Sequence, residues 1–178
     1  MIVTQLQNLA QDIGFSHTGE LNMDALVCRK DVRRMCEDNR CGCWNARWTC
    51  PPAFGDLAHA QKILSRFSRG VLVQSTEALR DPFDLETMRG AESRHKKRFS
   101  TLTRQARQVS PGCLPLGSGA CTLCRTCTYP DRPCRWPSRA HPSMEAYGLL
   151  ISDVLEQSGM SYNYGPGTIT YTSCILLL

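Results

Sequence analysis

The amino-acid sequence predicts a single α/β domain in which a small mixed sheet is flanked by helices and carries two cysteine-rich loops. Segments with helical periodicity alternate with short segments rich in β-branched residues, which is typical of an α/β sheet. The 178 residues form one domain, 1–178, by the usual domain size of roughly 100–200 residues. Most of the eleven cysteines fall in two stretches without periodicity, at about residues 28–54 and 117–140.

Four stretches repeat apolar residues every three or four positions, as amphipathic helices do. Asp56 and Ser143 stand where helix N-caps are expected, and the longest helix follows Asp84. Gly14 and Gly159 close the first and the last of the four. The expected helices cover residues 2–13, 56–67, 85–109 and 142–158.

Four shorter stretches have the composition of strands, with β-branched and apolar residues between turn residues. The clearest is VLVQS after Gly70, and the longest is the TITYTSCILLL stretch after Gly167. The expected strands cover residues 15–20, 71–75, 113–116 and 168–178.

The composition excludes a disordered chain and a membrane-spanning one. The chain carries a net charge of +5, with 42% hydrophobic residues and a mean hydropathy of -0.30. No stretch approaches the roughly 18 apolar residues of a membrane span. The N-terminal residues lack the pattern of a secretory signal, so we expect a cytoplasmic protein. Clustered cysteines in a reducing cytoplasm usually bind metal instead of forming disulfides.

The cysteines of the second loop give the stronger signal. Cys121, Cys124 and Cys127 form a C-x2-C-x2-C run, and Cys134 follows after six more residues. Two-residue spacers let thiolates converge from a tightly turned backbone, and this run is typical of iron–sulfur ligation. Zinc ribbons more often use two separated C-x2-C pairs. The spacing therefore favours an iron–sulfur cluster and leaves zinc as the alternative. The last spacing is longer than in bacterial ferredoxins, so the loop is not a copy of that motif.

The first loop contains Cys36, Cys41 and Cys50, followed by Pro51-Pro52, which restricts the backbone after a candidate ligand. Trp44 and Trp48 either shield a metal site from water or belong to the core. A site built on these three thiols needs a fourth ligand or keeps an open position. The remaining cysteines are Cys28, Cys43, Cys113 and Cys174.

Both cysteine loops and the C-terminal strand contain long distinctive stretches, MCEDNRCGCWNARWTCPP, SGACTLCRTCTYPDRPCRWPSRAHPSMEAYG and YNYGPGTITYTSC. These stretches resemble an uncharacterised family of predicted metal-binding proteins, found mainly in anaerobic bacteria and archaea. The resemblance covers about a third of the residues but spans positions 35 to 174. It strengthens the expectation of metal without supplying a reaction.

The resemblance implies metal, most simply one or two [4Fe-4S] clusters, bound through a set of matching cysteines. Cys174 matches the family's terminal motif and is therefore the favoured eighth ligand, whereas Cys43 departs from the family pattern. The implied ligands are Cys36, Cys41, Cys50, Cys174, Cys121, Cys124, Cys127 and Cys134.

Three further features have both a functional and a structural interpretation. Residues 86–109 carry seven basic side chains, which we interpret as a solvated helix face in preference to an interface for nucleic acid or an acidic redox partner. His95 lies on the apolar side of that helix and is expected to be a core residue. Glu145 or Tyr147, after the second loop, could donate protons beside a cluster.

The leading hypothesis is a small iron–sulfur protein that passes electrons to or from a partner protein. An enzyme with an incompletely ligated cluster at Cys36, Cys41 and Cys50 is the first alternative. A zinc protein whose basic face binds nucleic acid is the second.

Overall fold

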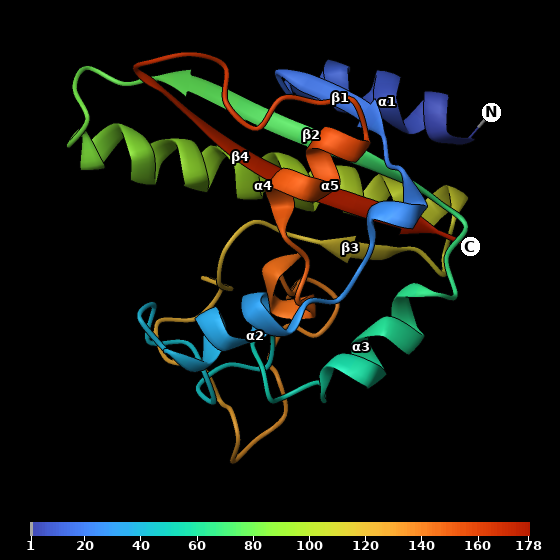
Figure 1. Cartoon of the computed structure of the whole chain (residues 1–178), viewed down its shortest axis with the longest axis vertical. Helices are drawn as coiled ribbons and strands as arrows, with labels where there is room; N and C mark the ends of the chain where they lie inside the picture. The colour runs from blue at the N-terminus through green and yellow to red at the C-terminus, as the bar shows by residue number, and fades with distance from the viewer. Residues whose placement is uncertain (1) are drawn as a thin grey trace.

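A four-stranded sheet forms the centre of the computed structural model, which describes residues 2–178 (Figure 1). The strands follow the order β1-β2-β4-β3. Their bounds are β1 His17–Glu20, β2 Arg69–Ala78, β3 Leu114–Leu116 and β4 Thr168–Leu177. The α/β fold class is confirmed. Every strand pairing is antiparallel, where we expected a mixed sheet, because alternation of helices and strands does not fix strand direction.

Helices cover both faces of this sheet, and short 3-10 turns complete the connections. The two long strands β2 and β4 pair along their whole length, from Arg69 opposite Leu177 to Ala78 opposite Thr168. The helices are α1 Ile2–Ile13, α2 Lys30–Glu37, α3 Leu57–Leu64, α4 Leu85–Val109 and α5 Ile151–Gln157, and the 3-10 turns are η1 Met23–Ala25 and η2 Glu145–Tyr147. None of these helices is both long and apolar enough to cross a membrane.

The two faces of the sheet form two separate apolar cores. Because side chains alternate along a strand, Val71 and Ile175 face α1 and α4, where Phe99 and Leu102 pack. Leu72, Cys174 and Leu176 face the opposite way, toward α3, α5 and η2. The cysteine loops lie beyond this second core, at the end of the molecule away from α1 (Figure 1).

Helix caps explain why several predicted boundaries are confirmed. The side chain of Asp56 accepts a hydrogen bond from the backbone N–H of His59 at 2.8 Å, at the start of α3. Asp84 accepts one from the N–H of Thr87 at 3.1 Å, at the start of α4. Gly14 follows α1 with a φ of 98°, a conformation that favours glycine.

Two expectations for the segments around the cysteine loops are wrong. Helix α2 lies inside the stretch that we interpreted as a loop. This helix lacks a periodic apolar face; its buried Arg33 instead donates hydrogen bonds to the carbonyl oxygens of Gly55 and Ala146, at 3.2 Å each. The helix expected at 142–158 is interrupted at Gly148, whose φ is 82°. A Cβ at Gly148 would lie 2.6 Å from the Leu57 side chain, so the break allows close packing against α3.

Candidate metal centre

Four cysteines of the second loop line one small pocket, and we call them the second cysteine group. Residues 118–140, which carry them, contain no helix or strand, so turns of the backbone bring the thiols together. Arg47 and Trp48 of the first loop complete the wall of the pocket. The members of the group are Cys121, Cys124, Cys127 and Cys134, all half-buried.

The surroundings of Cys127 favour a thiolate. Burial alone would raise the pKa of Cys127, but backbone N–H groups of Tyr129, Trp48 and Thr128 hydrogen-bond to the sulfur and bring the pKa below its ordinary value. Burial raises the pKa of Cys121, with the N–H of Leu123 acting in the opposite direction. Hydrogen bonds from N–H groups to sulfur are the kind of contact that stabilises and tunes cysteine-ligated metal sites.

A first cysteine group gathers around the end of α2 and the turn that follows it. Burial raises the pKa of Cys50 to about 11, and the nearby thiols of Cys43 and Cys41 raise it further. Burial also raises the pKa of Cys36, where Cys41 again contributes in the same direction. The group consists of Cys36, Cys41, Cys43 and Cys50. The structure thus places Cys43 beside two sequence-predicted ligands, Cys41 and Cys50.

Arg47 and Trp48 join the two groups. Arg47 donates from Nε to the sulfur of Cys43 at 3.3 Å and from Nη1 to the carbonyl oxygen of Cys121 at 2.8 Å. The indole N–H of Trp48 donates to the carbonyl oxygen of Arg132 at 3.1 Å, while its ring packs edge-on against Tyr129 at 4.9 Å. The two cysteine loops therefore pack directly against each other.

Sequence analysis missed Arg47, although one signal pointed to it. It is the only charged residue between Cys41 and Cys50. A lone cation among thiols is suited to offset thiolate charge, because opposite charges nearby favour the ionised form. Trp48, which belongs to the first loop, lines the pocket of the second group.

Cys174 lies apart from both groups. It occupies the centre of the sheet, with Leu72 and Leu116 as its partners on the neighbouring strands. Its side chain is 0% exposed and packs in the second core. Burial raises the pKa of this thiol far above its ordinary value. The structure does not bring Cys174 together with Cys36, Cys41 and Cys50.

The other two cysteines are also separate. Cys113 is buried in the core on the α4 side of the sheet. Cys28 packs at the edge of the opposite core, and burial raises its pKa to about 11, against the effect of Arg33. Cys28 in turn adds to the effect of burial in raising the pKa of Tyr147.

Glu145 lies close to the first group and has one buried carboxylate oxygen, Oε2, without a hydrogen-bond partner among the described residues 2–178. The carboxylate is near enough to Cys36 to raise the pKa of that thiol, after the larger effects of burial, Arg33 and Cys41. Ser143 caps the same turn by accepting from the N–H of Ala146 at 3.2 Å, as expected for an N-cap.

His95 has the structural role that the sequence predicted. It is 0% exposed and lies between two serine hydroxyls, with Nδ1 2.9 Å from Ser75 Oγ and Nε2 2.8 Å from Ser173 Oγ. Burial, followed by Arg98 and Lys96, lowers its pKa to about 3. A neutral imidazole with both nitrogens hydrogen-bonded is a satisfied core residue.

The donor chemistry of the two groups fits a thiolate-bound metal, since four cysteines of the second group line one pocket and N–H groups stabilise one of its sulfurs. Within residues 2–178, no three His, Cys, Asp or Glu side chains form a ready-made site for a metal ion. The groups are therefore defined by a shared pocket and by mutual electrostatic effects.

Comparison with protein families agrees with this chemistry. The model of the family described as "Predicted metal-binding protein (DUF2284)" matches residues 19–177, which include both cysteine groups. The chain belongs to this family. No curated protein and no solved structure matches the chain. Membership in this family supports the cysteines as metal ligands and does not identify the metal.

Proposed function

We propose that this member of the metal-binding family holds two iron–sulfur clusters side by side and passes electrons to a partner protein. The observation that carries the proposal is that Arg47 bridges the two cysteine groups. Its guanidinium donates to the sulfur of Cys43 and to the carbonyl oxygen of Cys121. Iron–sulfur clusters supply reversible one-electron chemistry. Two adjacent thiolate-rich sites suit the relay of electrons better than two isolated structural sites do.

For the second site we propose all four members of the second cysteine group as ligands. Support comes from the C-x2-C-x2-C spacing, which favours iron–sulfur over zinc, and from the single pocket that the four cysteines line. The N–H groups that lower the pKa of Cys127 would hold its thiolate in place. The ligands are Cys121, Cys124, Cys127 and Cys134.

For the first site we propose Cys36, Cys41 and Cys50, as the family resemblance implies, with Cys43 as the fourth ligand in place of Cys174. Cys43 is buried beside Cys50 and receives a hydrogen bond from Arg47. A ligand role for Cys174 would require its thiol to leave a packed apolar core, where nothing offsets the cost of ionising it.

The partner protein would approach the second site. Leu123 and Trp136 line the pocket of the second cysteine group and are 38% and 45% exposed. Exposed apolar side chains next to a redox site form a suitable docking point, since aromatic residues are enriched in protein interfaces. Arg125, Arg132 and Arg135 are exposed on the same loop, so a partner with an acidic surface is favoured.

Cysteine variants of anaerobically purified protein test this proposal. In reduced protein we expect an EPR spectrum broadened by two interacting paramagnets. Cys124→Ser and Cys41→Ser should each lose about half of the iron and leave a simpler spectrum of the remaining site. Full iron content in both variants would contradict two sites, and a spectrum with the same shape in wild type and in both variants would contradict their adjacency.

A matched pair of variants tests the fourth ligand. Cys43→Ser should lose or alter the first site, whereas Cys174→Ser should keep the iron content and the spectrum, because it changes a core thiol. The reverse result would restore Cys174 as the ligand. Cys174 is completely buried, so thermal unfolding of both variants serves to separate loss of ligand from loss of fold.

A second function, catalysis at the first site, is favoured by the buried and unpartnered Oε2 of Glu145 near Cys36. A site with three thiolates keeps an open position for an external molecule. Unchanged iron and spectra in both Cys43→Ser and Cys174→Ser would favour this function over simple electron transfer.

A further inference from the structure

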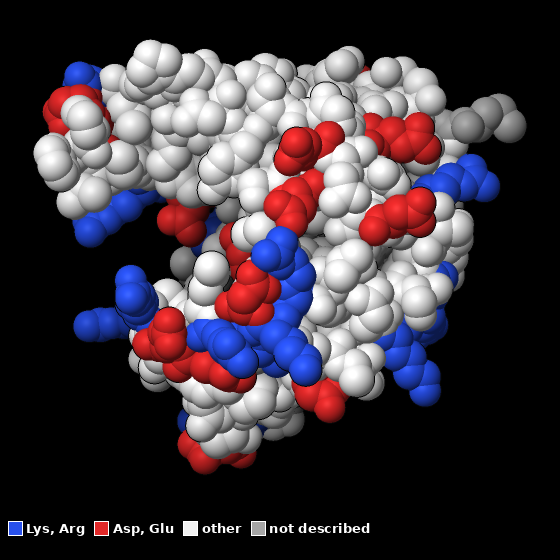
Figure 2. Space-filling view, in the orientation of Figure 1, with Lys and Arg blue, Asp and Glu red and all other residues white. Residues whose placement is uncertain are grey.

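A cavity of about 690 Å³ separates α4 from the chain that leads into the second cysteine group. Its volume is within the range of small-molecule sites. One wall is formed by α4, and the other by residues 117–123 together with Arg139 and His141. Figure 2 shows the molecule hollowed on the left, between its upper and lower parts, with Lys and Arg side chains along the hollow.

The charged residues that line this cavity are mainly cations. Glu92 is the one acidic side chain in the lining, and it pairs with Lys96 at 2.5 Å. Arg89, Lys97 and Arg139 also line the cavity and form no ion pair with any described residue of 2–178. Three unneutralised cations around one cavity create a positive potential that favours an anion.

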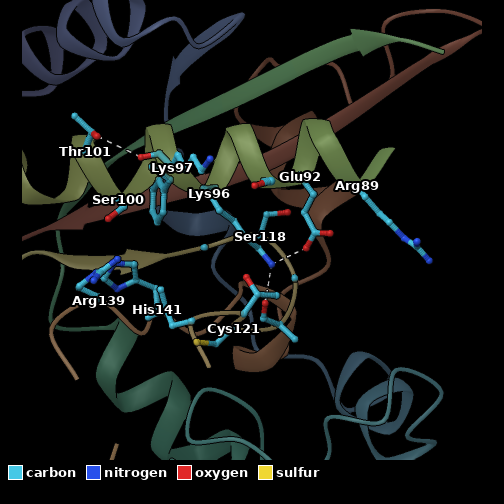
Figure 3. A pocket seen from close by; sticks show the side chains of 18 residues that line it. Arg89, Glu92, Lys96, Lys97, Ser100, Thr101, Ser118, Cys121, Arg139 and His141 are labelled. Carbon is cyan, nitrogen blue, oxygen red and sulfur yellow. Dashed lines mark hydrogen bonds and ion pairs between the residues drawn. The ribbon is translucent and has the colours of Figure 1, made fainter. Parts of the chain in front are cut away.

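Lys96 fixes the two walls relative to each other. Its ammonium donates to Glu92 Oε1 and, at 2.7 Å, to the carbonyl oxygen of Ala120 on the opposite wall. Figure 3 shows Lys96 reaching from α4 across to the chain near Ser118 and Cys121. The cavity is therefore held open by the fold, and a ligand would not have to pay for ordering it.

The floor of the cavity supplies neutral contacts. His141 packs edge-on against buried Phe99, with ring centroids 5.9 Å apart. Burial, with Arg107 as a second cause, lowers the pKa of His141 to about 4, so its imidazole is neutral at pH 7. Hydroxyl groups of Ser100, Thr101 and Ser118 also line the space. These groups suit the uncharged part of an organic molecule and leave its anionic groups to the cations.

Cys121 connects this cavity with the second cysteine group. It lines both the cavity and the small pocket of Cys124, Cys127 and Cys134. We propose that the cavity binds a small organic anion, carrying carboxylate or phosphate groups, against the Cys121 side of the second site. Only the adjacency to a metal rests on the proposed function; the binding of the anion rests on the cavity and its charges.

A nucleic acid is the less suitable ligand for this cavity. Its basic side chains surround a concave space with an aromatic floor, whereas a duplex needs cations that follow a phosphate backbone across an open surface. A second hollow of about 670 Å³, which includes Arg104 and Arg107, shares Arg139 and His141 with this cavity. An elongated anion could extend in that direction.

Calorimetric titration of the anaerobically purified full chain with inorganic phosphate and with citrate tests the proposal at low salt. We expect saturable binding of at least one of them at one site per chain. Lys97→Gln/Arg139→Gln should weaken it roughly tenfold or more, because charge-assisted hydrogen bonds are lost. Lys62→Gln/Arg66→Gln, which removes the same charges from exposed positions at α3, is the matched control and should change affinity less than twofold.

The proposal would be overturned by the absence of saturable binding of either anion, or by equal weakening in the α3 control. Tight, strongly salt-dependent binding of a DNA duplex in place of the small anions would also overturn it and would favour a nucleic-acid interface. Metal content is measured on the same samples. Binding of the anion by protein that contains no iron would retain this inference and reject the proposed function. Iron–sulfur content without anion binding would reject this inference and leave the proposed function in place.

Discussion

Arg47 of the first cysteine loop donates from Nη1 to the carbonyl oxygen of Cys121 in the second, at 2.8 Å. Burial opposes the charge of this guanidinium, but its hydrogen bond to Cys43 and the nearby thiols outweigh burial and raise the pKa of Arg47. One permanent cation therefore serves both groups. Loss of either loop's structure would remove a partner of the other.

Replacement of Arg47 by Gln should destabilise the protein by about 1–3 kcal/mol, because buried partners of a charged donor are left unsatisfied. Urea unfolding under anaerobic conditions measures the change in the free energy of unfolding. Arg40→Gln, at an exposed position of the same loop, is the control and should have little effect. Equal effects of the two substitutions would show that Arg47 does not connect the loops.

Trp48→Phe should loosen the second loop around Arg132. The substitution keeps an aromatic ring against Tyr129 but removes the indole N–H that donates to the Arg132 carbonyl oxygen. Limited trypsin digestion followed by mass spectrometry should show faster cleavage after Arg125, an exposed residue of the same loop, since Pro133 prevents trypsin from cleaving after Arg132. Trp136→Phe, at a 45% exposed ring, should leave that rate unchanged; the same rate in both variants would assign Trp48 a packing role alone.

His95 should make stability depend on pH in acid. Burial, then Arg98 and Lys96, lowers its folded pKa to about 3, whereas an unfolded histidine titrates near pH 6.5. The unfolded state thus binds the extra proton first, and the stabilising contribution of neutral His95 is lost as the pH falls below about 6.5. It is present in full above that pH.

The comparison with His95→Gln isolates this contribution. The difference in unfolding free energy between wild type and variant should shrink by about 1.4 kcal/mol for each pH unit between 6 and 4. Urea unfolding at several pH values measures it. A difference that stays constant over this range would show that His95 is charged in the fold or is not buried as described.

Removal of metal should unfold both cysteine loops together. Residues 118–140 contain no helix or strand, so their order depends on their ligands and on the first loop. Chelation or air oxidation should expose both loops to proteolysis, while α1, α4 and the sheet between them stay protected by their own core. Protection that is unchanged, or lost from one loop only, would contradict this coupling.

Periodicity was sufficient to predict the regular part of the fold. Helix α4 and strand β4 each carry a long local pattern, and capping by Asp84 marks where α4 begins. Helix α2 was not predicted, because it is stabilised by Arg33, which donates hydrogen bonds to carbonyl groups distant in sequence. The break at Gly148 likewise depends on contact with Leu57.

The candidate site was predictable to a similar extent. Short spacings group the thiols of Cys121, Cys124 and Cys127, because neighbours in a turn are neighbours in space. The position of Cys174 was not accessible in this way, since it depends on β4 lying at the centre of a sheet that is covered on both faces. The contact of the two loops through Arg47 also required the three-dimensional arrangement.

The central claim, two adjacent iron–sulfur sites, is tested most directly by iron, acid-labile sulfide and zinc analysis of anaerobically purified protein. The proposal predicts roughly 8 iron atoms per chain with matching sulfide, if both sites hold [4Fe-4S] clusters. Stoichiometric zinc without sulfide would contradict it.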